Sequence, residues 1–278
     1  MRLILTSLLL LSSSYAAAAV NCQFHADCNL DIDPAGLRAL RIELSSSDLH
    51  VQGVAGLARI EVRGRACASE QDWLADLNVI QARSGDKVVV KQAESHEHHV
   101  GGFGNNYAYI DFEVRVPANL PLEVDSASGD ADISNIAALD FSSASGDLKL
   151  DHATGAVAVK VSSGDVVASD LGSFTLHSSG SGDMHISDVR GEVKVGRVGS
   201  GDLHFGDVHG GVQIDSIGSG DLEAERIGGD VVLGSIGSGD VDANHVSGSL
   251  IVKAAGSGEI HHGQIGGHVD VPKNHADD

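Results

Sequence analysis

The sequence predicts an all-β protein that coils as a right-handed parallel β-helix, or β-solenoid, with rungs of about 19 residues and an irregular N-terminal β cap. The first observation is a Ser-Gly-acid step that occurs eight times, at intervals of 17, 18, 18, 19, 19, 19 and 19 residues. A fixed period near 20 residues is typical of solenoids. The second observation is the composition, with one Trp, six Phe and three Tyr but 35 Gly in 278 residues. This indicates a narrow aliphatic core with many corners.

Each rung begins with a short half-buried strand. The residue after the acid is apolar in all eight rungs, and the residue two positions later is apolar in seven, His262 being the exception. The residue between them is polar except for Val167, which gives the alternation of a strand with one buried face. A second apolar pair follows a glycine turn. Because like strands recur one period apart, we expect them to stack in parallel, about 4.8 Å apart. An antiparallel sandwich or barrel with frequent turns is the competing interpretation.

Four segments are expected. Residues 1–19 have the basic start, apolar stretch and alanine-rich end of a signal peptide. Residues 20–116 should form the N-terminal cap and first coils, residues 117–271 the regular solenoid, and residues 272–278 a polar tail.

Within the cap, several elements are expected. Ser45–Val51 looks like a decayed rung start, and residues 84–90 are either another one or a hairpin turn. Ser69 could cap a short helix. Residues 95–106 should be a loop, residues 109–116 a strand, and Val269 and Val271 the last strand.

Charge and export limit the partners. Without the leader, 17 Lys and Arg stand against 39 Asp and Glu, a net charge of −22. Nucleic acid and anionic lipid need basic patches, so both are disfavoured. The leader predicts export to the periplasm or the extracellular space, and no later apolar segment is long enough for a membrane anchor. We expect a monomer without cofactors.

Three cysteines, Cys22, Cys28 and Cys67, would follow the leader. In an oxidising compartment one disulfide is expected, with one cysteine left over. We favour the pair Cys22–Cys67, with Cys28–Cys67 as the alternative.

The acids of the repeated step have two interpretations. Stacked carboxylates repel by about 1 kcal/mol per pair at the dielectric of water, so they need compensation. We favour structural turns in which each acid accepts corner N–H groups and serines add hydrogen bonds; the turns at Gly201, Gly220 and Gly239, with the acids that follow them, are the clearest. The alternative is a row of bound Ca²⁺. The candidate metal ligands are Asp183, Asp202, Asp221 and Asp240 in the row, and His96, His98 and His99 in the loop.

Catalysis has little support in the sequence. Lys and Arg of the coil share no register, and no nucleophile elbow, phosphate loop or zinc-hydrolase helix occurs. We therefore predict a protein that is not an enzyme; a localised cluster of acids and bases that breaks the repeat would favour an enzyme, and the sequence shows none.

From Tyr109 onward the sequence resembles a family of exported bacterial adhesins, the "head GIN" type of adhesin-like β-solenoid domain. The resemblance lies in the segment VRVPANLPL at residues 114–122 and in the repeated SGD rungs, and GRACAS at residues 64–69 is similar to related envelope proteins. It implies the fold and export but no catalytic residue.

We therefore expect a non-enzymatic, adhesin-like binding or structural protein of the cell envelope, whose ligand is an envelope or extracellular protein or glycan. The alternatives are a calcium-binding or glycan-acting solenoid module and a self-assembling solenoid filament.

Overall fold

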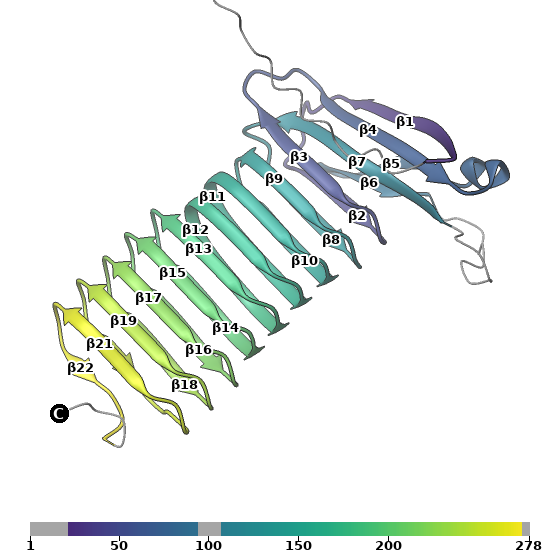
Figure 1. The fold of residues 1–278 in the computed structure, drawn as a ribbon. Coiled ribbons are helices and arrows are strands. Elements are labelled where there is room, and N and C mark those ends of the chain that lie inside the picture. The colour runs from purple at the N-terminus through teal and green to yellow at the C-terminus, as the bar shows by residue number, and fades with distance from the viewer. Residues whose placement is uncertain (1–21, 94–106, 274–278) are drawn as a thin grey trace, which may run out of the picture.

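The computed structural model describes residues 22–93 and 107–273, which form a parallel β-solenoid with two faces (Figure 1). The first face, which we call the front face, contains in spatial order β1 (Phe24–Ile32), β4 (Ile60–Ala68), β7 (Ala108–Pro117), β3 (Leu49–Val54), β9 (Ala131–Ile136), the first halves of β11 (Leu148–Ser163) and β12 (Val166–Ser181), β13 (Met184–Val189), β15 (Leu203–Val208), β17 (Leu222–Ile227), β19 (Val241–Val246) and β21 (Ile260–Ile265).

The opposite face, the back face, is formed by the other strand of each rung. It contains in spatial order β5 (Val79–Ser84), β6 (Lys87–Gln92), β2 (Ala39–Leu44), β8 (Leu122–Ser126), β10 (Leu139–Ser145), the second halves of β11 and β12, β14 (Val193–Ser200), β16 (Val212–Ile217), β18 (Val231–Ile236), β20 (Leu250–Val252) and β22 (Val269–Asp270). The predicted parallel solenoid is therefore confirmed, with two strands in each rung.

The core is the narrow space between the two faces. Equivalent residues of successive rungs are direct neighbours, as Leu203, Leu222 and Val241 are, and each of these is fully buried. The bulkiest buried side chains belong to Phe141, Phe174 and Phe205. Because each rung buries its inward stripe only against its neighbours, the fold depends on regular stacking.

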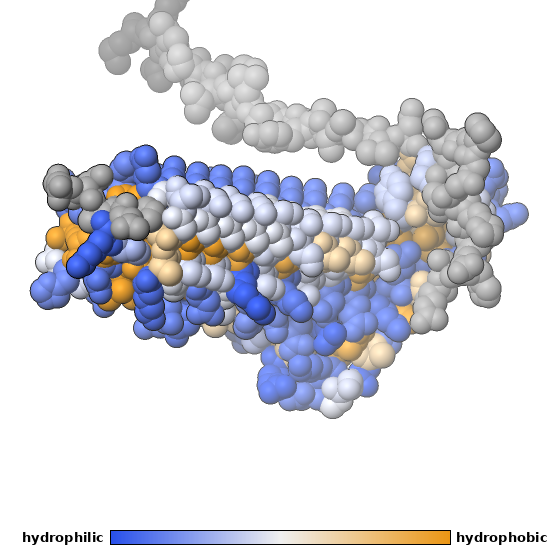
Figure 2. Space-filling model, turned by 90° about the horizontal axis from the view of Figure 1, so that it is seen from below, coloured by the Kyte–Doolittle hydropathy of each residue, from blue (hydrophilic) through white to orange (hydrophobic). Residues whose placement is uncertain are grey.

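Glycine is required at the corner before each front-face strand because successive corners pack backbone against backbone. A Cβ atom on Gly239 would lie 1.8 Å from the carbonyl oxygen of Gly220, and one on Gly220 would lie 1.9 Å from that of Gly201. No larger residue fits there without separating the rungs. In Figure 2 this corner is the pale band of near-neutral residues that runs along the solenoid beside a blue row of acids.

A second column of unusual residues bends each front-face strand before its last inward residue. Eight non-glycine residues adopt left-handed backbone angles, with φ between 54° and 60°: Asn135, His152, Asp170, Asp188, Asp207, Arg226, His245 and Gln264. Such angles cost about 1–2 kcal/mol for residues other than glycine. The sequence pattern did not indicate this column.

The N-terminal cap changes the order of the chain. The coil formed by β2 and β3 lies between β6 and β8 on one face and between β7 and β9 on the other, so an early segment is inserted between two later ones. Outside it, β4 and β1 continue the front face as antiparallel strands, and β5 does so on the back face. Figure 1 shows these strands covering the end of the solenoid, where an open edge could pair with another chain.

Three local predictions for the cap can now be compared with the structure. Residues 84–87 form a hairpin turn between β5 and β6, with Gly85 at φ 62°, rather than a decayed rung. The predicted helix is a 3₁₀ helix, η1 (Gln71–Ala75), but its N-cap is Glu70. Ser69 was the wrong cap, and its hydroxyl instead accepts a hydrogen bond from the N–H of Tyr107. The expected loop at residues 95–106 lies outside the described residues.

Candidate functional site

The repeated acids form one continuous ladder along the front face. In this acid column, each Oδ1 accepts a hydrogen bond of 2.7–3.0 Å from the backbone N–H of the acid in the next rung. The column consists of Asp48, Asp130, Asp147, Asp165, Asp183, Asp202, Asp221, Asp240 and Glu259. The bonds thus run between rungs rather than within one corner, and each N–H offsets part of the repulsion between neighbouring carboxylates.

Serine contributes in only part of the ladder. Ser126 and Ser143 each donate a hydrogen bond to the carbonyl oxygen two residues later, at 3.0 and 2.9 Å, which supports two corners near the cap. Ser179 stands in the same inward column, between Val161 and Val198. Its hydroxyl is buried without a hydrogen-bond partner among the described residues.

The candidate metal ligands are placed as follows. Asp183, Asp202, Asp221 and Asp240 are exposed members of the acid column, and each uses Oδ1 for the next rung. Within residues 22–93 and 107–273, no three His, Cys, Asp or Glu side chains gather around a point suited to a metal ion. The candidates His96, His98 and His99 lie outside the described residues.

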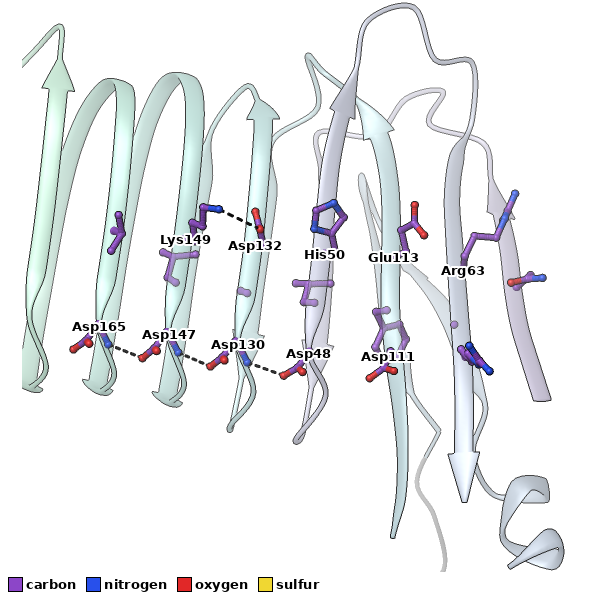
Figure 3. Close-up of a pocket in the computed structure, with 18 of the residues that line it drawn as sticks. Asp48, His50, Arg63, Asp111, Glu113, Asp130, Asp132, Asp147, Lys149 and Asp165 are labelled. Atoms are coloured by element: carbon purple, nitrogen blue, oxygen red, sulfur yellow. Dashed lines mark hydrogen bonds and ion pairs between the residues drawn. The ribbon is translucent and has the colours of Figure 1, made fainter. Parts of the chain in front are cut away.

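The acid column meets the cap at a junction where its register continues onto other strands. Because Leu49 pairs with Phe112, Asp48 and Asp111 stand side by side, and Asp111 in turn pairs with Arg65 of β4. Figure 3 shows Asp111 in line with Asp48, Asp130, Asp147 and Asp165. The column therefore extends across the inserted coil to the cap.

A second row of outward side chains runs parallel to the acid column, two residues further along each strand. At the junction this second row comprises Arg63, Glu113, His50, Asp132, Lys149 and Val167. It is visible in Figure 3 as the upper line of labelled side chains from Arg63 to Lys149. Cations and acids are mixed here, and Lys149 lies 3.8 Å from Asp132.

Between the two rows lies a groove with a volume of about 1000 Å³, which we call the junction groove. Its walls are the acid column, extended to Asp111, and the second row. Its floor is formed by the residues between the two rows, among them Gly64, Phe112, Leu49, Ala131 and Leu148. At Gly64 a Cβ atom would lie 2.9 Å from the carbonyl oxygen of Cys28, so glycine is required at this point of the floor.

The pKa of the Asp111 carboxyl in the groove is raised above its ordinary value. Partial burial and then the negative charge of Asp48 raise the pKa of the Asp111 carboxyl, while Arg65 acts in the opposite direction. Arg63, across the groove, is held by Asp31 at 2.8 Å. Arg65 is exposed and has no ion-pair partner within 4.0 Å in the described part of the chain. The groove thus combines fixed charges with groups that can still bind a ligand.

The junction groove therefore brings acids and bases together outside the regular repeat. The members come from residues 27–29, 48–50, 63–65, 111–113 and 130–167, which the inserted coil and the antiparallel cap strands bring together. The alternation of residues 109–116 indicated which side chains point outward. Nothing in the sequence indicated which strand would be their neighbour.

Cys28 and Cys67 lie on the cap strands β1 and β4, and Cys22 precedes β1. A disulfide joins Cys22 to Cys67, the pair favoured from the sequence, and it ties the N-terminal arm to β4. Cys28 is a buried free thiol, and burial raises its pKa. A buried thiol of raised pKa is a poor nucleophile.

A second polar cluster lies on the left-handed column. Asp170 contacts His152 and Arg190, and the hydrogen bond from His152 is the main cause that lowers the pKa of its carboxyl. Arg226 binds Asp207 through two nitrogens, at 2.6 and 2.8 Å. These side chains are about half exposed, so they strengthen the bend of each strand rather than form a cleft.

The fold and the site define a parallel β-solenoid with an antiparallel N-terminal cap and a groove at the junction of the two. The chain belongs to the Toastrack DUF4097 family, whose model matches residues 69–228. A comparison with curated proteins finds no match. No helix among the described residues has the length and hydropathy needed to span a membrane.

Several solved structures match this chain at low sequence identity. A "putative adhesin" from Bacteroides fragilis is 10% identical, with 88% of this chain and 97% of that chain covered and a TM-score of 0.42. A "putative lipid binding protein" from Parabacteroides distasonis is 14% identical, with 89% and 97% covered and a TM-score of 0.46. A "putative cell adhesion protein" from Clostridium sporogenes is 11% identical, with 69% and 99% covered and a TM-score of 0.38.

Proposed function

We propose that this protein is an exported, non-enzymatic, adhesin-like binding protein of the bacterial cell envelope, and that it binds its ligand in the junction groove. The observation that carries the proposal is the groove itself, about 1000 Å³ in volume and lined by charged side chains from separate segments of the chain. Concave sites with a few convergent polar groups are where ligands usually bind.

The position of the groove supports a binding role. Along the regular rungs the acid column serves the fold, since each acid holds the next rung. At the junction, Asp111 and Arg65 extend the column without that constraint, because their strands belong to the cap. Their polar atoms are available to a ligand. The groove is rigid because its walls stand on paired strands, so little ordering is needed on binding.

The proposal is tested by blocking the groove. His50 is exposed in the middle of the second row, and His204 occupies the same row outside the groove. We expect His50→Trp to abolish co-sedimentation of the purified protein with a cell-envelope fraction, and His204→Trp to leave it unchanged. Thermal unfolding verifies that both variants are folded. Equal co-sedimentation of the two folded variants would place the binding surface elsewhere.

A further inference from the structure

We propose that the ligand of the junction groove is a linear polymer of amino sugars with free amines, an inference that rests on the function proposed above. The first step concerns the acid wall. Asp48, Asp130 and Asp147 each use Oδ1 for a backbone N–H and are exposed. An ionised carboxylate only accepts hydrogen bonds. The wall therefore offers a row of acceptors and selects a ligand rich in donors.

The charge balance of the whole groove gives the sign of the ligand. Its lining contains eight carboxylates, three Lys and Arg, and one histidine. Two of the three cations are already near acids, Arg63 at Asp31 and Lys149 at Asp132. The net potential is negative, so anionic polymers are repelled and ammonium groups are attracted.

The spacing of the wall favours a sugar polymer over a peptide. Successive acids stand on neighbouring strands, which are about 4.7–4.9 Å apart. Side chains on one face of an extended peptide repeat at about 6.6–6.8 Å, out of step with the wall. Sugar rings in an extended glycan advance by a length close to the strand spacing, so each ring can place an ammonium or hydroxyl donor opposite an acid.

The opposite wall is polar or charged along most of its length, with Val167 as its one apolar member. Val167 is 51% exposed and ends the second row next to Lys149, where it can contact the C–H groups of a sugar ring. The floor between the rows is backbone and buried side chain, and it includes Gly64 between Arg63 and Arg65. A single glycan strand can therefore lie along the groove and across the strands.

The experiment is calorimetric titration of the purified protein with three probes: a glucosamine hexamer, an N-acetylglucosamine hexamer and hexalysine. The test variant is D130N with D147N, because asparagine keeps the Oδ1 acceptor for the next rung while it removes the charge. The matched control is D221N with D240N, the same change in the same column outside the groove.

We expect the glucosamine hexamer to bind the wild-type protein, with an affinity that falls about tenfold in the test variant and does not change in the control. The N-acetylated hexamer should bind at least about tenfold more weakly, since its amines carry no charge. Equal binding of the two hexamers would overturn the requirement for free amines, and hexalysine binding as tightly as glucosamine would overturn the requirement for a sugar.

The two proposals fail in different ways. If no glucosamine binding is seen while His50→Trp still abolishes co-sedimentation with the envelope fraction, the amino-sugar ligand is wrong and the groove stands as the binding surface. If glucosamine binds but D130N with D147N has no effect, the sugar binds outside the groove and this inference is overturned.

Discussion

Replacement of one corner glycine should be among the most destabilising single changes in this protein. In Gly239→Ala the new methyl group would lie 1.8 Å from the carbonyl oxygen of Gly220 and 2.5 Å from its carbonyl carbon. Both are backbone atoms of a neighbouring rung and cannot rotate away. The rungs must separate locally, which lengthens hydrogen bonds such as that from the Asp240 N–H to Asp221.

The magnitude follows from the cost of overpacking, about 1–3 kcal/mol where side chains can adjust. Since only backbone is available to move, we expect a loss at the upper end, about 3 kcal/mol. For a domain of this size that corresponds to a melting temperature lower by roughly 6–12 °C. Thermal and urea unfolding followed by circular dichroism measure it.

Gly206→Ala is the matched control. A methyl group there would have its nearest neighbours at 3.9 Å, at the ends of the Arg226 and His204 side chains. We expect it to be neutral or to stabilise by up to about 1 kcal/mol through the unfolded chain. If the two variants unfold at the same temperature, close stacking of corners is not what makes glycine necessary.

Three further predictions concern stability, each measured by urea unfolding. Ser179→Val should raise the free energy of unfolding by about 1–3 kcal/mol, because it removes a buried hydroxyl without a partner; Ser143→Val, which loses a bond to the Ser145 carbonyl, should gain clearly less, and an equal gain would refute the argument. His245→Gly should stabilise by about 1 kcal/mol because His245 has φ 56°, whereas Gln213→Gly in an ordinary strand should destabilise; the reverse order would contradict a strained column. Because the pKa of Asp170 is lowered in the folded protein, the carboxylate makes its full contribution to stability above about pH 4. That contribution is lost as the pH falls through the lower folded pKa. The free energy of unfolding of the wild type should therefore exceed that of Asp170→Asn by less than about 1 kcal/mol at pH 6, since the pair is about half exposed. This difference should vanish in strong acid, and a difference that grows in acid would contradict a lowered pKa.

Sequence reasoning reached the solenoid because the period is a local property. The alternation around Leu203 and Leu222 determines which side chains point inward, and the period determines that like strands stack. The order of the cap could not be reached in this way. Whether Asp48 stands beside Asp111 or beside Asp130 depends on the insertion of β3 between β7 and β9, and it stands beside both.

The left-handed column was missed for a different reason. Its members include Asn, Asp, His, Arg and Gln, and only Asn and Asp commonly signal such backbone angles. The direction of the ladder bonds was also missed, because a Gly-Asp step is compatible with bonds within a corner or between rungs. Only the stacking of the corners in the structure shows that the hydrogen bonds run between rungs.

The account rests most directly on the claim that the junction groove, rather than the regular part of the acid column, contacts the ligand. Carboxyl footprinting by mass spectrometry, on wild-type protein with and without the envelope fraction, tests this claim on the native side chains. We predict protection of Asp111, Glu113 and Asp130, which line the groove, and no protection of Glu223, Asp242 and Glu259, which lie outside it. Protection spread evenly along the solenoid, or confined to its far rungs, would contradict the account.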